Sequence, residues 1–347
     1  MKKTLVAIAA LTAVSAFAQS SVTLGGAVDL RLAIGNGSTS NKTQLTKNGV
    51  TSSKLYISAT EDLGGGLKAN IFMDADLNPD NGTGGGTTLD NQGAVAGNGG
   101  LIFNRRSTIS LMGGFGEVRL GRDYTPHFWN YTFYDPFGTQ GVASNLALTG
   151  STGGSTTVRA SNTIGYLTPN FGGFSGQIQT YFGENNSNAA APAGSNAGSG
   201  TSLRVAYGQG PISVGLSWGR TTTSTTSDVT STSLGGSYDL GIAKIMGSYN
   251  IDANTGQPDT RGFVFGATAP MGPGLLKASL SQTDRGNDVV GRMFGIGYEY
   301  NLSKRTGLYA TIATITNSSR AAFSANGSVT KPGDGSTGFD LGVKHTF

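Results

Sequence analysis

The sequence contains no cysteine, which excludes a disulfide scaffold, a thiol nucleophile and a metal site with cysteine ligands. It has only two histidines, and charged residues make up just 13% of its 347 residues. Beyond the N-terminal region, no stretch approaches the roughly 18 unbroken apolar residues that a membrane-spanning helix requires. The chain is therefore not a helical inner-membrane protein.

An excess of charge of one sign is also missing. The whole sequence has a formal net charge of +4, and no basic run indicates nucleic-acid binding. The first residues have the pattern of a secretion signal, in which Lys2 and Lys3 precede an apolar run and an A-x-A cleavage site at 16–18. We expect residues 1–18 to be removed, so that the mature chain, 19–347, starts at Gln19 with 22 basic and 20 acidic residues.

The sequence is rich in glycine, with 56 residues, and in short segments that alternate apolar and polar residues. In the last segment, Phe339, Leu341, Val343, His345 and Phe347 share one parity. Alternation with a period of two sends successive side chains to opposite faces of a sheet. One apolar face along the whole chain, with connections that are short and long in turn, predicts an outer-membrane β-barrel.

The connections predict the number of strands. Seven are short, at 61–67, 113–117, 169–174, 208–211, 239–243, 270–274 and 301–306. Eight are long and polar, at about 35–52, 78–101, 123–157, 183–201, 220–231, 251–262, 283–292 and 316–337. Eight long loops that each join an up strand to a down strand require sixteen strands in one all-β, antiparallel transmembrane barrel. A barrel of about this size leaves an aqueous channel, whereas a membrane anchor usually needs only about eight strands.

Parity also assigns side chains to the lumen. Because Leu55 and Ile109 take the lipid side, Lys54 and Arg106 face inward, and the same argument places Arg159 in the lumen. Glycines at inward positions are expected as well, at 215, 219, 295 and 297. Simple solvation of a wet wall is the alternative role for each of these charges.

The third long loop, at about 123–157, carries seven aromatic residues, more than a solvent-exposed loop needs. We expect it to fold into the barrel and narrow it. The alternative is an external loop that covers the mouth or packs on a neighbouring subunit. Its acids are Asp123 and Asp135, and it faces a basic wall that includes Arg122. A basic constriction opposite few acids favours anions.

With these residues assigned, the chain resembles the Gram-negative general porins of the β-proteobacterial type. The motifs span the mature chain: QSSVTLGGAVD at its start, TEDLGGGLKA at 60–69, RRSTISL and GFGEVRLGRD between 105 and 123, YDPFG at 134–138, RASNTIGYLTPNFGGFSG at 159–176, NLSKRTGLYA at 301–310 and GVKHTF at the end.

The resemblance implies an outer-membrane homotrimer, surrounded by lipid and lipopolysaccharide, with an inward third loop and passive diffusion of small hydrophilic solutes and anions. It assigns the constriction by motif, and it implies that the strand ending in Phe347 is read by the barrel-insertion machinery. This chain departs from the family at two positions. It has Lys54 where relatives commonly have Arg, and Asp135 in the YDPFG motif of the loop where relatives often have Glu. The implied constriction residues are Lys54, Arg105 or Arg106, Arg122 and Arg159, with Asp123 and Asp135 on the loop side.

No other chemistry is indicated. His127 and His345 lack the context of a catalytic group, so we expect no enzyme, no cofactor and no catalytic or metal site. Acids at 74, 76 and 80 could attract a divalent cation, although a solvated lumen or rim is the simpler role. The competing functions are a solute-specific channel of the same fold, which would need a line of aromatics along the lumen, and an anchor or adhesin.

Overall fold

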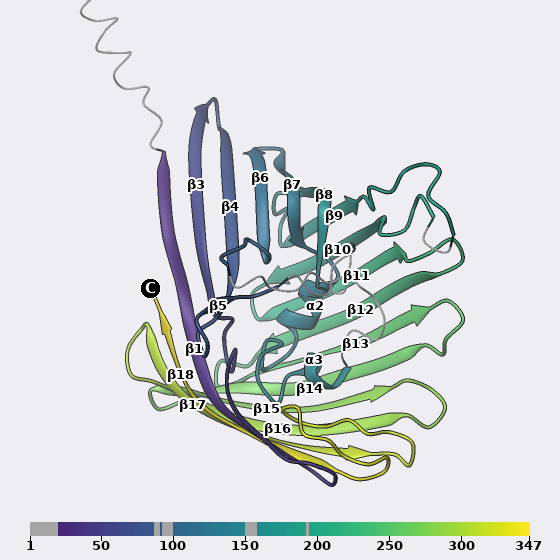
Figure 1. The fold of residues 1–347 in the computed structure, drawn as a ribbon. Helices are drawn as coiled ribbons and strands as arrows, with labels where there is room; N and C mark the ends of the chain where they lie inside the picture. The colour runs from purple at the N-terminus through teal and green to yellow at the C-terminus, as the bar shows by residue number, and fades with distance from the viewer. Residues whose placement is uncertain (1–19, 87–90, 92–99, 150–157, 192–193) are drawn as a thin grey trace, which may run out of the picture.

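A closed ring of antiparallel strands forms the molecule (Figure 1). The computed structural model describes residues 20–86, 91, 100–149, 158–191 and 194–347, so the expected signal peptide lies outside the described residues. The first half contains β1 (Ser21–Gly37), β2 (Lys42–Lys47), β3 (Lys54–Gly64), β4 (Leu67–Asn78), β5 (Thr83–Gly84), β6 (Arg106–Gly113), β7 (Gly116–Tyr124), β8 (Arg159–Leu167) and β9 (Phe174–Tyr181).

The second half is more regular, and each strand pairs with the next along the chain. It contains β10 (Gly200–Gln209), β11 (Ile212–Thr222), β12 (Asp228–Asp239), β13 (Lys244–Asn254), β14 (Thr260–Met271), β15 (Gly274–Asp284), β16 (Val290–Asn301), β17 (Thr306–Asn317) and β18 (Ser336–Thr346). Two helices among the described residues, α2 (Phe128–Phe133) and α3 (Asn145–Thr149), belong to the third long loop. No helix among the described residues has the length and apolar character needed to cross a membrane.

The eighteen strands amount to a sixteen-stranded barrel. Both β2 and β3 pair with β1, β2 opposite Leu30–Gly35 and β3 opposite Ser21–Ala27, so they are two parts of one barrel strand. The two-residue β5 pairs only with the end of β4, inside the second long loop. The predicted sixteen strands and seven short connections are confirmed, but residues 42–47 are strand rather than loop.

The ring closes where the first strand meets the last. Antiparallel pairs run from Ala27 opposite Thr346 to Gly37 opposite Ser336. Beyond them, Gly26 and Phe347 exchange two backbone hydrogen bonds of 3.0 and 3.1 Å. Closure matters because an unpaired backbone group in hydrocarbon costs several kcal/mol.

Side chains alternate across the wall as the sequence predicts. On β16, Phe294 and Ile296 are exposed on the outer face, whereas Met293 is buried. The inner face carries small or polar side chains, and many of these are covered by the third long loop. Apolar residues on the outside and small residues on the inside follow from a barrel with lipid around it and water within it.

The third long loop lies inside the barrel, where α2 and α3 occupy the ring of strands (Figure 1). It rests on glycines of the inner wall. A Cβ at Gly215 would lie 2.6 Å from Oδ1 of Asn130, and one at Gly235 would lie 2.2 Å from the ring of Tyr134. A Cβ at Gly295 would lie 2.3 Å from Cβ of Ala143. These strands need glycine because side chains of the loop approach them closely, and the prediction of an inward-folded loop is confirmed.

Candidate functional site

A cavity of about 760 Å³ separates the third long loop from the opposite inner wall. The loop contributes mainly aromatic and uncharged side chains, and the wall contributes most of the charges. Five cationic side chains and two carboxylates line the cavity, which is a surplus of three positive charges: Lys47, Lys54, Arg105, Arg106 and Arg159 against Asp74 and Asp76.

The loop is held against its own side of the barrel by hydrogen bonds to the wall. The amide of Asn130 donates to the carbonyl oxygens of Gly215 and Ser233, at 2.9 and 3.0 Å, and accepts from Nε of Arg204 at 2.7 Å. Further along the loop, the backbone N–H of Val142 donates to Asp340 at 2.8 Å. These contacts fix the loop across the lumen, so the cavity has a firm boundary on that side.

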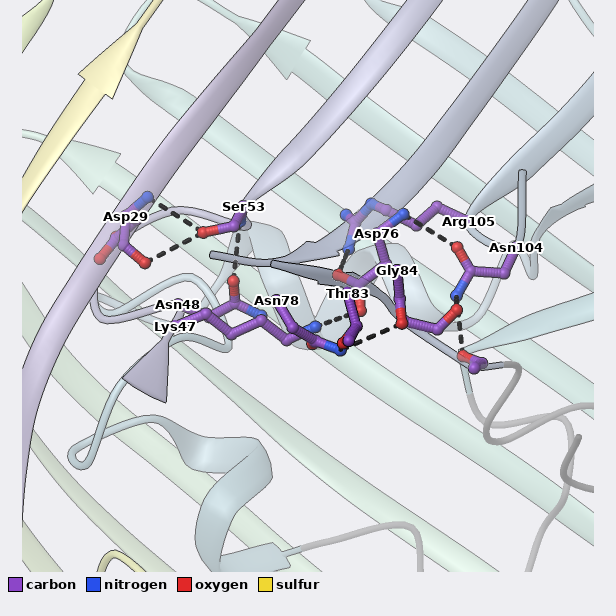
Figure 2. Close-up of polar contacts among 12 residues, drawn as sticks. Asp29, Lys47, Asn48, Ser53, Asp76, Asn78, Thr83, Gly84, Asn104 and Arg105 are labelled. Atoms are coloured by element: carbon purple, nitrogen blue, oxygen red, sulfur yellow. Dashed lines mark hydrogen bonds and ion pairs between the residues drawn. The ribbon is translucent and has the colours of Figure 1, made fainter. Parts of the chain in front are cut away.

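On the opposite wall, acids hold two of the five cations (Figure 2). Nε of Arg105 lies 3.1 Å from Oδ2 of Asp74, and its Nη1 lies 3.6 Å from Oδ1 of Asp76. Lys47 forms an ion pair with the same Asp76. The guanidinium of Arg105 also donates to the hydroxyl of Tyr124 at 2.6 Å. Arg105 is buried, and its charge is largely balanced by these carboxylates.

Loop segments before β3 and after β4 support these charges (Figure 2). Asp29 accepts the backbone N–H groups of residues 49, 50 and 51 at 2.8–3.1 Å, which draws residues 48–53 inward between β2 and β3. The amide of Asn104 donates to the carbonyl oxygens of Gly85 and Gly86, at 2.9 and 2.7 Å. Lys47 and Arg105 therefore sit on backbone that is itself tied to the wall.

Lys54 and Arg159 present charge without a carboxylate. Within the described part of the chain, neither side chain forms an ion pair. The guanidinium of Arg159 lies over the ring of Tyr124, 4.4 Å from its centroid, and donates to the Tyr124 hydroxyl at 2.8 Å. Nζ of Lys54 lies 5.9 Å from the centroid of Tyr56. These two cations contribute most directly to the positive surplus of the cavity.

Arg106 and Asp123 meet, but Asp123 has a closer partner. Its carboxylate accepts from Nη1 of Arg119 at 2.6 Å and lies 3.5 Å from Nε of Arg106. Arg119 in turn pairs with Glu117 at 2.8 Å. Arg106 also lies over the ring of Phe72, 4.5 Å from its centroid. Asp123 is only 2% exposed, so it does not offer a free negative charge to the cavity.

Arg122 does not line this cavity. Its Nε donates to the carbonyl oxygen of Asn104 at 2.6 Å, and its Nη1 donates to the hydroxyl of Ser161 at 2.8 Å. On β7, Arg119 and Asp123 share one parity, and Arg122 has the other. The register with β8 shifts between Gly121 and Asp123, so parity alone does not decide which face carries Arg122. Arg122 was expected in the basic wall opposite the loop, and the resemblance implied the same position.

Asp135 is an organiser of the loop. Its carboxylate accepts three backbone N–H groups, from Phe137, Asn145 and Thr139, at 2.9, 2.9 and 3.1 Å. Burial raises the pKa of Asp135 from 3.8 to about 6, although these hydrogen bonds and the charge of Lys277 act in the opposite direction. Since Asp135 is 4% exposed, neither acid of the loop projects freely into the cavity.

Sequence reasoning missed Lys47 and the role of two wall acids. Lys47 lies in a stretch expected to be an external loop, and no parity could be assigned to it there. Asp74 and Asp76 were considered as a cation site, but they pair with Arg105 and Lys47 instead. Among the described residues, no cluster of three or more His, Cys, Asp or Glu side chains is arranged to hold a metal ion.

Comparisons with known sequences match this chain over most or all of its length. The family model described as Gram-negative porin matches residues 4–320. Outer membrane porin protein 32 of Delftia acidovorans is 35% identical, with all of both chains covered. An outer membrane porin protein of Bordetella pertussis is 27% identical, again with all of both chains covered.

Solved structures of porins have the same fold as this chain. The anion-selective porin from Comamonas acidovorans superposes with a TM-score of 0.82 at 33% identity, covering 95% of this chain and all of that one. The trimer form of OmpT from Vibrio cholerae has a TM-score of 0.64 at 15% identity, with 94% and 99% of the two chains covered. The second similarity concerns the fold alone.

Proposed function

This chain belongs to the family of Gram-negative porins, and we propose that its channel prefers anions among the small hydrophilic solutes that it passes. It is a porin of the outer membrane. The observation that carries the anion preference is the surplus of three positive charges around the cavity. Lys54 and Arg159 supply charge that no carboxylate balances in the described part of the chain. One similar structure is itself named an anion-selective porin, which supports the same preference.

The proposal extends to assembly and export. A homotrimer is supported by the similar barrel that is named as a trimer form, and the surroundings would be outer-membrane lipid and lipopolysaccharide. We infer that residues 1–18 direct export and that residues 19–347 form the barrel, with the insertion machinery reading the strand that ends in Phe347. A passive channel needs no catalytic step, so we propose that the protein is not an enzyme.

Single-channel recording under a tenfold KCl gradient tests the anion preference. The purified protein should give open, ohmic steps in groups of three, with a reversal potential that marks chloride preference. A cation-selective reversal would contradict the role of the basic cavity while leaving the porin itself intact. Absence of conductance from correctly folded protein would contradict the channel.

Lys54→Gln and Arg159→Gln should each lower the ratio of chloride to potassium permeability. Two unit charges about 4 Å apart in water interact by about 1 kcal/mol, so the ratio should fall by up to about fivefold for each change. Arg261→Gln is the matched control, because that side chain is 60% exposed and lies outside the cavity. Equal effects in all three variants would indicate general surface charge rather than the constriction.

A further inference from the structure

A row of aromatic rings runs along the third long loop. The rings of Trp129 and Phe133 are stacked, with centroids 5.3 Å apart and planes 14° apart. Tyr124 continues the row, with its centroid 5.1 Å from that of Trp129. Phe128 supports the row from behind, at 5.5 Å from Tyr124. We call Tyr124, Trp129 and Phe133 the aromatic track.

Trp129 and Phe133 are not among the buried residues that seat the helix. On α2, Phe128 and Tyr131 are 6% and 1% exposed and fill the contact with the barrel wall and the rest of the loop. Trp129 and Phe133 are four residues apart and share another face of the helix. Phe133 is 49% exposed although the loop lies inside the barrel, so part of its ring stays accessible beside Trp129 and Arg204. This accessible apolar surface next to a guanidinium is what a passing solute could contact.

A guanidinium lies at each end of the track. Arg159 covers Tyr124 at 4.4 Å from its centroid, and Arg204 lies 5.1 Å from the centroid of Phe133. Trp129 and Tyr124 also line the cavity that carries the positive surplus. An occupant that fits both features has a flat ring to contact the exposed part of Phe133 and a negative group to reach a guanidinium.

We propose that the aromatic track is a weak, saturable binding site for aromatic carboxylates on their way through the channel. The inference rests on the proposed anion preference and names a class of anion that the channel holds longest. A saturated carboxylate of the same charge and size would be attracted by the same cations but would lack the ring-to-ring contact. The rings therefore discriminate between solutes that the charges treat alike.

Benzoate and cyclohexanecarboxylate are the matched pair of probes. Each is added to an open channel that carries chloride current, and the reduction of current is measured against probe concentration. Because ring–ring contacts contribute about 0.5–1.5 kcal/mol, benzoate should reach half-saturation at a concentration about two- to tenfold lower. Equal half-saturation by the two probes would overturn the proposal.

Leucine variants separate stacking from charge. Trp129→Leu and Phe133→Leu keep an apolar side chain, and each should remove the preference for benzoate. Phe133 does not line the charged cavity, so the chloride selectivity of Phe133→Leu should stay that of the wild type. Phe171→Leu is the control, because Phe171 is an exposed aromatic in a short connection far along the chain from the loop. A benzoate preference that survives both loop variants would also overturn the proposal.

Fluorescence gives a readout that does not depend on current. The chain has two tryptophans, and Trp218→Phe would leave Trp129 as the only one. Titration with 4-nitrobenzoate, an aromatic quencher, should quench Trp129 saturably, and 4-nitrobenzyl alcohol, which lacks the charge, should need a higher concentration. Non-saturating quenching, equal for both compounds, would reject the site.

The outcomes also distinguish this inference from the proposed function. Loss of chloride preference in the wild-type channel would defeat the proposed anion selectivity. Normal chloride preference without discrimination between benzoate and cyclohexanecarboxylate would defeat only the aromatic site. The role of the rings would then be their cation–π contacts with Arg159 and Arg204.

Discussion

At the scale of single residues, the carboxylate of Asp135 combines burial with an electrostatic role. It ties three backbone N–H groups of the loop together and is also within the electrostatic influence of Lys277. Burial raises its pKa to about 6, so the carboxyl group is ionised at neutral pH and becomes protonated in mildly acidic solution. The loop therefore carries a negative charge that a modest change of pH removes.

We predict that anion preference increases as pH falls from about 7.5 to 5. Protonation of Asp135, whose pKa is about 6, removes one negative charge from the loop. At a separation of about 10 Å in water, one charge changes the local concentration of an anion by about twofold. Reversal potentials measured at a series of pH values would show the increase.

Asp135→Asn serves as the matched variant, since the amide is neutral at every pH and its single oxygen can still accept the backbone hydrogen bonds of one of the two carboxylate oxygens. At neutral pH its selectivity should match that of the wild type in acid, and its own pH response near 6 should be absent. A response of unchanged size in this variant would assign the titration to another group.

Residue-level prediction from sequence succeeded where strand alternation applies and failed where it does not. Alternation identified Lys54, Arg106 and Arg159 as inward, and all three line the cavity. Arg122 was expected in the basic wall opposite the loop, and also by motif, but it lies at an irregularity of β7 where alternation does not apply. Lys47 lies at the end of β2, and the same barrel strand resumes as β3 after residues 48–53 leave the ladder. No local sequence pattern predicts this interruption. The participation of these residues in ion selectivity stays a prediction.

At the scale of elements, the third long loop and the strands beneath it are fitted to each other. The ring of Tyr134 comes so near the wall that a Cβ at Gly235 would lie 2.2 Å from Cδ2 of Tyr134. The hydroxyl of Tyr134 is meanwhile hydrogen-bonded to Ser213 at 3.1 Å. The ring therefore cannot swing away without breaking this contact.

Gly235→Ala should displace α2 from the wall. The added methyl group overlaps the Tyr134 ring, and overpacking of this kind costs about 1–3 kcal/mol. We expect altered single-channel conductance and greater current noise, together with a lower midpoint of thermal unfolding. Gly165→Ala is the control on the inner face, where the new Cβ would have its nearest neighbour at 3.7 Å. Similar behaviour of the two variants would contradict the proposed seat for the loop.

The number of strands and their short connections could be predicted because each hairpin repeats the same local pattern. The position of the third long loop could be inferred from its excess of aromatics, but the path of the loop could not. That path depends on contacts between distant residues, such as Asn130 with the carbonyl of Gly215 and Val142 with Asp340. Pairings across such separations leave no periodic signal in the sequence.

At the scale of the whole molecule, the absence of cysteine makes the closure of the ring testable. Leu32 on β1 is directly opposite Leu341 on β18, and both face outward. Directly opposed residues on antiparallel strands have Cα atoms about 4.5–5.5 Å apart, within the range of a disulfide. Because the chain has no cysteine of its own, an intramolecular cross-link could form only between the two introduced cysteines.

Leu32→Cys combined with Leu341→Cys should form a disulfide on mild oxidation of the folded barrel. The cross-linked chain should run faster than the reduced chain on a denaturing gel, and the bond should stabilise the barrel by about 5–6 kcal/mol in the chain-entropy account. Leu32→Cys with Ile296→Cys, which places the second thiol on β16, is the control. Equal cross-linking in both pairs, or none in the first, would contradict the register of the seam.

The interruption between β2 and β3 has a consequence for the kinetics of hydrogen exchange. In a closed ring every strand has two neighbours, so opening any strand requires two ladders to break at once, and amide exchange should be slow all the way round. Residues 48–53 leave the ladder, and the N–H groups of residues 49–51 are held instead by the carboxylate of Asp29. Amide exchange in the barrel wall should therefore begin next to residues 48–53, beside the charges that line the channel.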